Sequence, residues 1–175
     1  IWGGQIINLG EVEMDGNLQV NSNGEIYNYG IWENDGNLQV NNLFENHGQL
    51  DIDGNLQANG SANSLVNTDT IEVDGNVALN REFTNDGYIY IDGDLDNNSG
   101  SFTNNYIVEI DGEFENNNEL VNNGLIEVEE ELEHNGSQGI TMGEGALITT
   151  EDITVNQPIA GPSSGCASIQ VSENT

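Results

Sequence analysis

Six carboxylates recur in pairs along the second half of the chain. Within each pair one residue separates the two acids, and successive pairs are about 19 residues apart. On neighbouring strands such rows would lie about 4.8 Å apart and repel one another. Oxygen-only ligands suit hard cations, Ca²⁺ before Mg²⁺. The pattern therefore predicts a candidate Ca²⁺ site, with a solvated acidic surface as the alternative, at Asp94, Asp96, Glu113, Glu115, Glu131 and Glu133.

The same positions of the earlier repeats carry uncharged amides instead. Such a row can hydrogen-bond a polysaccharide, pack against a copy of itself, or be plain solvated surface. Tyr88 and Tyr90, which alternate with apolar residues, are expected to point outward, where their rings can stack on sugars. The amide positions are Asn17, Gln19, Asn37, Gln39, Asn55 and Gln57.

No set of residues predicts catalysis. His47 and His134 lie in different repeats, and no Ser-His-Asp or Cys-His arrangement can be inferred. Carboxylate pairs are too common here to identify an acid and a base, and Arg81 is the only Lys or Arg. His134 takes the inward place that Val20 holds earlier, which predicts a core or corner role. We therefore predict a protein that is not an enzyme.

These side chains are positioned by one repeated phrase: an alternating segment, an Asp-Gly corner and a second alternating segment. QLDIDGNLQAN at 49–59 recurs as EVEMDGNLQV, IWENDGNLQV, TIEVDGNVAL and YIYIDGDLDN, about 18 to 21 residues apart. The glycine after each acid is expected to permit the corner geometry. The predicted structural corners are Asp15, Asp35, Asp53, Asp74, Asp92 and Asp111, with the degenerate Glu129 last.

A period of this length predicts a solenoid. Alternate residues of each segment form three apolar stripes, which predict an all-β, roughly triangular parallel β-helix of about 19 residues per turn and seven or eight turns. A right-handed path follows from the crossover preference of parallel strands. One turn cannot bury its apolar face alone, whereas stacked turns enclose a continuous core.

Asparagine is the second organising residue. One Asn follows each apolar residue of the third stripe by two positions. Asn tolerates left-handed backbone, and stacked amides can hydrogen-bond from turn to turn. We therefore predict a structural asparagine ladder at Asn28, Asn46, Asn67, Asn85, Asn104 and Asn122.

With its Asn-rich corners, the repeated Asp-Gly phrase resembles the Asn/Gly-rich β-solenoid repeats of large secreted bacterial surface and adhesin-like proteins. The resemblance covers about residues 10–135 and implies an exported, extracellular or cell-surface protein. One solenoid domain is expected at 1–156, regular over about 9–136 and irregular over 137–156. Residues 157–175 are expected to be a Pro/Gly/Ser loop followed by a C-terminal strand or linker.

The formal charge of −30 excludes several partners. Binding to nucleic acid phosphates or anionic membranes requires basic side chains, which this chain lacks. No apolar run is long enough to span a membrane, so no membrane insertion is expected. For the single Cys166 three states stay open: a disulfide to another chain, a disulfide to sequence not present here, or a buried thiol.

Neither end of the solenoid has an evident cap. An uncapped turn exposes apolar surface and strand edges, and head-to-tail stacking of copies would bury both and form a filament. The alternative is that the natural chain continues. We therefore expect a non-enzymatic extracellular structural protein that forms a homopolymer, and alternatively an adhesive or carbohydrate-binding module that contacts an extracellular glycan. The candidate self-association residues are Ile1, Trp2, Ile6, Ile7, Ile169 and Val171.

Overall fold

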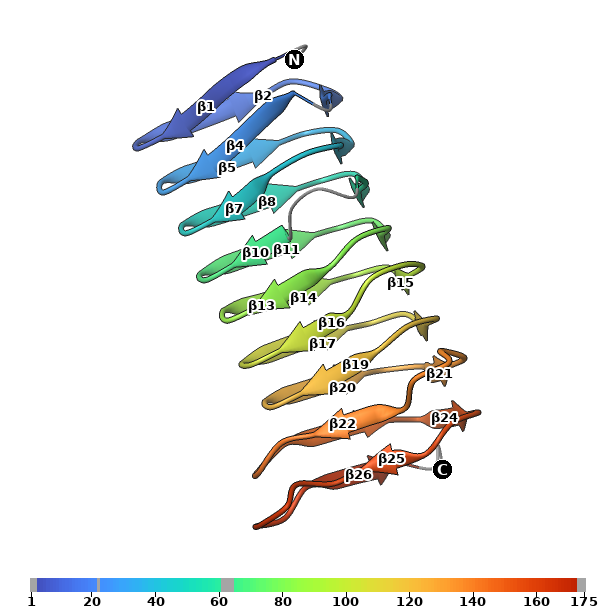
Figure 1. The fold of residues 1–175 in the computed structure, drawn as a ribbon. Helices are drawn as coiled ribbons and strands as arrows, with labels where there is room; N and C mark the ends of the chain where they lie inside the picture. Colours follow the sequence, from blue (N-terminus) through green and yellow to red (C-terminus); the bar gives the residue numbers. More distant parts are fainter. Residues whose placement is uncertain (1–2, 22, 61–64, 173–175) are drawn as a thin grey trace.

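The computed structural model describes residues 3–21, 23–60 and 65–172. Its strands are short and stack into about nine turns along one axis, as Figure 1 shows. Three parallel sheets run along the stack, and each turn contributes one strand to each sheet, except that the last turn adds none to the third sheet among the described residues. The predicted all-β parallel β-solenoid is confirmed.

Sheet A consists of β1 (Gly4–Asn8), β4 (Gly24–Asn28), β7 (Phe44–Asn46), β10 (Leu65–Asn67), β13 (Phe83–Asn85), β16 (Phe102–Asn104), β19 (Leu120–Asn122), β22 (Ile140–Met142) and β25 (Ile159–Ala160). Sheet B consists of β2 (Glu11–Met14), β5 (Ile31–Asn34), β8 (Gln49–Ile52), β11 (Thr70–Val73), β14 (Tyr88–Ile91), β17 (Ile107–Ile110), β20 (Leu125–Val128), β23 (Leu147–Thr150) and β26 (Ser168–Val171). Sheet C consists of β3 (Leu18–Val20), β6 (Leu38–Val40), β9 (Leu56–Ala58), β12 (Val77–Leu79), β15 (Leu95–Asn97), β18 (Phe114–Asn116), β21 (Glu131–His134) and β24 (Asp152–Val155).

The solenoid is longer than the seven or eight turns expected. Strands β22 to β26 pair in parallel with the strands of the preceding turns, although their corners lack the Asp-Gly phrase. Stacking requires only an alternating segment that continues each sheet, because backbone hydrogen bonds between turns do not depend on the corner residue. Counting Asp-Gly corners therefore underestimated the number of turns.

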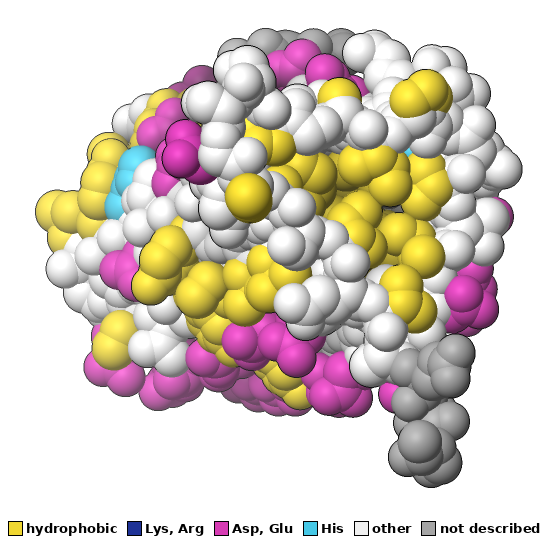
Figure 2. All heavy atoms as spheres, turned by 90° about the horizontal axis from the view of Figure 1, so that it is seen from below, with side chains coloured by type: hydrophobic (Ala, Val, Ile, Leu, Met, Phe, Trp, Pro, Cys, Tyr) yellow, Lys and Arg dark blue, Asp and Glu magenta, His cyan; other side chains and the backbone are white. Residues whose placement is uncertain are grey.

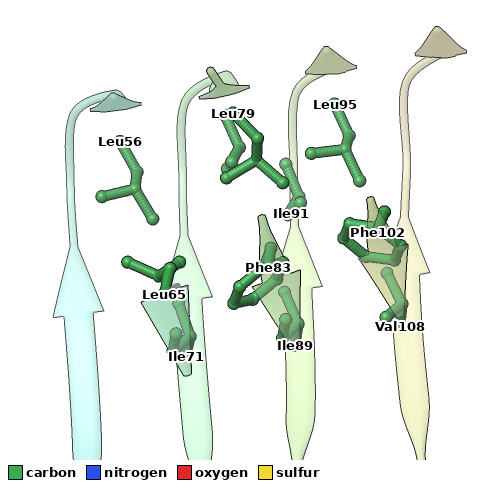
Figure 3. A pocket seen from close by; sticks show the side chains of 11 residues that line it. Leu56, Leu65, Ile71, Leu79, Phe83, Ile89, Ile91, Leu95, Phe102 and Val108 are labelled. Atoms are coloured by element: carbon green, nitrogen blue, oxygen red, sulfur yellow. The ribbon is translucent and has the colours of Figure 1, made fainter. Parts of the chain in front are cut away.

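The core fills the space between the three sheets. The inward residues predicted for the central turns, such as Leu50, Ile52 and Leu56, are at most 4% exposed. In Figure 3, Leu65, Phe83 and Phe102 lie in one row, one from each successive turn, and face leucines from sheet C. The gap among these side chains has a volume of about 10 Å³ and an apolar lining, so it is a packing defect and holds no ligand.

The asparagine ladder is confirmed, and it begins one turn earlier than predicted, at Asn8. Six consecutive amide-to-amide hydrogen bonds of 2.8–2.9 Å link Asn8 to Asn122 through the predicted members. Most members also donate to a backbone carbonyl of the next turn, as Asn46 does to Thr70 at 2.8 Å. All are buried. No described residue other than glycine has a positive φ, so the expected left-handed backbone at Asn is wrong.

A second, shorter ladder lies inside sheet C and was not predicted. Asn97 donates to Asn116 at 2.6 Å, and the Asn116 amide lies 2.7 Å from Nδ1 of His134. Nε2 of His134 lies 2.7 Å from the carbonyl of Gln138, which requires the tautomer that carries its proton on Nε2. His134 is fully buried, so its expected core role is confirmed.

Most corner glycines are required by close approach between turns. Among the glycines that follow the corner acids, only Gly16 has a left-handed φ, at 94°. At Gly54 an added Cβ would lie 2.7 Å from the carbonyl carbon of Gly36 and 2.8 Å from the side-chain oxygen of Asn37. Glycine is therefore required at this corner because the neighbouring turn leaves no room for a Cβ, and the backbone conformation does not require it.

Substitution Gly54→Ala is expected to destabilise the solenoid by about 1–3 kcal/mol, since the new methyl group overpacks the contact between two turns. Urea unfolding followed by circular dichroism measures the change. Gly161→Ala is the matched control, because a Cβ there meets nothing within 4 Å. Equal unfolding midpoints for the two variants would contradict this account of the corner.

Candidate functional site

The six predicted carboxylates lie together on the outer face of sheet C. They line one surface hollow of about 70 Å³ over β15, β18 and β21. The parallel register places Asp96 beside Glu115, and Glu115 beside Glu133, in one column. We call this surface the acidic half of sheet C.

Several of these carboxylates already accept hydrogen bonds from the protein. Asp94 accepts the backbone N–H of Glu113 at 3.1 Å and the amide of Asn76 at 3.2 Å. Glu131 accepts the Thr154 hydroxyl at 2.8 Å. Within the described residues, no three Asp, Glu, His or Cys side chains converge as a metal site would require. The acidic half thus gathers oxygen ligands without arranging them around one preformed ion position.

Crowding shifts the ionisation of this surface. Partial burial, followed by the charges of Glu115 and Asp94, raises the pKa of Asp96 above the ordinary 3.8. On sheet B, partial burial and the charges of Asp53 and Asp74 raise the pKa of Asp51 in the same way. Both shifts mean that the folded state disfavours the carboxylate form of these side chains.

Mild acidification is therefore expected to stabilise the fold. The folded-state pKa of Asp96 lies above its unfolded value, so just above pH 3.8 the folded chain binds more protons than the unfolded chain. The free energy of unfolding therefore falls as pH rises through this interval, and it recovers as pH falls. Replacing Asp96→Asn should raise the free energy of unfolding at neutral pH by about 0.2–1 kcal/mol, a range limited by solvent screening. Urea midpoints at about pH 7 and about pH 4.5 measure both effects.

Glu144→Gln is the control for this prediction, since Glu144 is an exposed turn residue outside the carboxylate rows. A midpoint that falls steadily from neutral pH downward would contradict the predicted sign.

The amide residues line a larger hollow on the same sheet. It has a volume of about 540 Å³ and lies over β3, β6 and β9, where all six predicted amides border it. We call this surface the amide half of sheet C. Asn17 and Asn37 also fix the corner, since each side-chain oxygen accepts the backbone N–H of the equivalent residue one turn on at 2.8 Å.

A further asparagine column borders this face and was not singled out from the sequence. Asn59 donates to Asn41 at 3.0 Å, and Asn80 donates to Asn59 at 2.9 Å. The signal available in the sequence was an Asn that directly follows each of these sheet C segments, once in every repeat.

The predicted corner acids stack at the edge between sheets B and C. All are exposed except the half-buried Asp111. From Asp35 on, each donates its backbone N–H to the preceding turn, as Asp53 does to Asn34 at 3.1 Å.

Tyr88 and Tyr90 point outward from sheet B, as predicted, but their hydroxyls are engaged. Tyr88 donates to Glu109 and Tyr90 to Asp111, both at 2.6 Å. The hydrogen bond to Asp111, helped by burial, raises the pKa of Tyr90 to about 12. Burial and the bond to Glu109 raise the pKa of Tyr88 as well.

The predicted self-association residues lie in three different settings. Ile6 and Ile169 are partly buried in inward columns at opposite ends of the stack, and Val171, 48% exposed, lies beside Ile169. Ile7 is 54% exposed and alternates with Ile6, so it lies on the outer face of sheet A. Ile1 and Trp2 lie outside the described residues.

The remaining candidate groups do not form a catalytic arrangement with one another. His47 stacks on Tyr29 with ring centroids 4.9 Å apart and contacts Glu45 at 3.2 Å, two turns or more from buried His134. Cys166 is an exposed free thiol, not a buried one. In the part of the chain that the structure describes, no helix has the length and hydropathy to cross a membrane.

Comparison with known proteins returned no match for this chain among protein-family models, curated proteins or solved structures.

Proposed function

We propose that this chain is a non-enzymatic structural protein of the cell exterior whose solenoid stacks head to tail into a filament or stalk. The observation that carries the proposal is the match between the two end turns. The extracellular setting is supported by the resemblance of the repeats to secreted bacterial surface proteins and by the near absence of basic residues.

Both ends of the stack expose the core. In the first turn Ile6, Val12 and Leu18 are only partly buried, whereas their equivalents one turn on are at most 1% exposed. In the last turn Ile159 is 45% exposed. Figure 2 looks onto this end and shows hydrophobic side chains across the middle of the face, with Asp and Glu side chains along its edge.

The strand register allows one copy to continue another. Following each column from turn to turn places Ile159 in the column of Ile6. In the same way Ile169 falls in the column of Val12 and Ile153 in that of Leu18. In-register stacking would thus pack apolar on apolar at the centre of sheets A and B and pair two open strand edges. Sheet C is one strand shorter, so Ile153 and Leu18 would share a column but lie two turns apart.

The outer faces are also compatible at this junction. Extending the register places Ser168 over Glu11 and Gln170 over Glu13. None of these positions sets a carboxylate against a carboxylate. Inside the stack, by contrast, Glu33, Asp51 and Glu72 follow one another in a single column. The end turns therefore lack the like-charge repulsion that the interior tolerates.

Negative-stain electron microscopy over a range of protein concentrations tests the proposal. We expect fibres whose length grows with concentration, and their loss in Ile169→Glu, which places a charge in the end face. Thr141→Glu adds the same charge on the exposed outer face of sheet A and should leave the fibres intact. Single short rods at every concentration would reject end stacking and favour a chain that continues beyond this segment.

A Ca²⁺ role of the acidic half is tested in the same images. Fibres that require millimolar calcium and vanish with chelator would give the carboxylates a bridging role between copies. Fibres under both conditions would leave them as a solubilising surface.

Carbohydrate binding is the second candidate function. The amide half supports it, because a hollow of about 540 Å³ lined by side-chain amides offers donors and acceptors for sugar hydroxyls. Saturable binding of a neutral polysaccharide that is lost in Gln39→Ala would favour this function, and the lack of such binding would remove it.

A further inference from the structure

Sheet C carries two halves that differ in charge and in shape. Its outward positions can be numbered by turn, from the pair Asn17 and Gln19 in the first to the pair Glu131 and Glu133 in the seventh. The eighth turn carries Asp152 and Thr154 and lies beyond the two halves. Turns one to three carry the amide half, and turns five to seven carry the acidic half. The fourth turn, between them, carries Asn76 and Ala78.

The two halves lie at equal distances on either side of the fourth turn. The hollow is about 540 Å³ over the amide half and only about 70 Å³ over the acidic half. A depression lined by amides thus lies on one side of Ala78, and a fuller surface of carboxylates lies at the same distance on the other side.

We propose that sheet C is the interface of an antiparallel dimer of this chain, in which the amide half of each copy packs against the acidic half of the other. A two-fold axis that lies in the interface, parallel to the strands and level with the fourth turn, generates this arrangement. Both copies then use the same surface, and the contact closes on itself. The proposal does not rest on end stacking, which uses different residues.

The symmetry sets specific residues opposite one another. Gln57 faces Asp96, Gln39 faces Glu115 and Gln19 faces Glu133. The outward residues nearest the corner face one another in the same way: Asn55 faces Asp94, Asn37 faces Glu113 and Asn17 faces Glu131. Each carboxylate therefore meets an amide, which donates hydrogen bonds that a carboxylate accepts.

The amides retain donor capacity for these contacts. Asn55 donates to the side-chain oxygen of Asn37 at 3.1 Å, and Gln39 donates to Asn41 at 3.4 Å. A primary amide carries two N–H donors, so each of these side chains has one more to offer. Donors from the partner would offset the mutual repulsion of Asp96 and Glu115.

Other pairings of the same faces are less favourable. A parallel dimer would set the acidic halves against each other, carboxylate on carboxylate, at a cost that like charges impose on any interface. An antiparallel dimer shifted by one turn would place Asp96 opposite the methyl group of Ala78 and leave it without a donor. Only the axis level with Ala78 pairs all six carboxylates, and the small side chain permits close approach there.

The contact is small. Seven turns at about 4.8 Å, each with about five residues from the corner to the end of its sheet C segment at about 3.3 Å, give an interface on the order of 1,100 Å² for both copies. This area lies at the low end of specific interfaces, so the dimer is expected to be weak and reversible.

Sedimentation of the full chain from micromolar to millimolar concentration tests the proposal. The variant Ile169→Glu serves as the background, so that end stacking does not contribute. We expect an equilibrium between 18.9 kDa and twice that mass, without added calcium. Gln39→Glu with Gln57→Glu should weaken dimerisation at least about tenfold, because carboxylates would then face carboxylates. Gln39→Lys with Gln57→Lys should strengthen it.

Thr84→Glu with Thr103→Glu is the matched control, since these two neighbours on the outer face of sheet A add the same charge away from the interface. Equal effects of the two acidic double variants would overturn the proposal. So would a chain that stays monomeric at millimolar concentration.

Cross-linking tests the position of the axis. In a Cys166→Ser background, Ala78→Cys places two thiols opposite each other across the two-fold axis. Packed sheets lie about 10 Å apart, too far for a disulfide, so a short bismaleimide is the reagent. We expect rapid covalent dimerisation of Ala78→Cys and none of Thr84→Cys on sheet A. Equal yields from both variants would overturn the antiparallel register.

Discussion

Replacing Asn85→Leu is expected to destabilise the solenoid by about 3–5 kcal/mol. The Asn85 amide donates to Gly87 at 2.6 Å, to Asn104 at 2.9 Å and to Ile107 at 3.0 Å. Its side-chain oxygen accepts from Asn67 at 2.9 Å. Leucine fills a similar volume but makes none of these bonds, and buried polar groups left without a partner cost about 1–3 kcal/mol each.

Urea unfolding followed by circular dichroism measures the loss. Asn105→Ala is the matched control, because the neighbouring Asn105 is exposed and its side chain hydrogen-bonds only to other exposed side chains: it donates to Asp86 and accepts from Asn123, both at 2.7 Å. The control should change the free energy of unfolding by less than about 0.5 kcal/mol. If Asn85→Leu stays within that same range, the ladder is not a major source of stability.

Trypsin is expected to cleave the folded chain at least about 100-fold more slowly than the chain in urea, since cleavage of a protected site follows the population of the open form. The chain offers one site, Arg81, which is 4% exposed. Its guanidinium donates to the backbone carbonyls of Asn42 and Asn59. Burial lowers the pKa of Arg81, because the charged form is less well solvated there than in water.

Cleavage would yield residues 1–81 and 82–175, which gel electrophoresis and mass spectrometry identify. Ser163→Arg places a second site in an exposed loop and should be cut rapidly in the folded protein, which confirms that the protease is active. Rapid cleavage at Arg81 under native conditions would mean that the corner between β12 and β13 opens locally. Since the single site reports unfolding, the same assay also ranks Asn85→Leu and Gly54→Ala.

The candidate surfaces were largely predictable because they follow from the repeat. Once Asp-Gly sets the phase, alternation decides which residues point outward, and Asp96, Glu115 and Glu133 necessarily share a column. Whether the acids converge on one ion is a matter of side-chain direction, which alternation does not specify. The structure brings them into one hollow and leaves them apart as metal ligands.

The sequence by itself determined the parallel β-solenoid, its inward stripes and the asparagine ladder, because each depends on spacing along the chain. Tertiary structure alone decided what depends on distance between turns. Gly54 is required by the backbone of the turn beside it, and Asn97, Asn116 and His134 form a ladder because successive turns bring their side chains within hydrogen-bonding distance. The last turns joined the stack without their Asp-Gly corner for the same reason: hydrogen bonds between neighbouring strands hold a solenoid together, and a corner motif only marks where one of its turns bends.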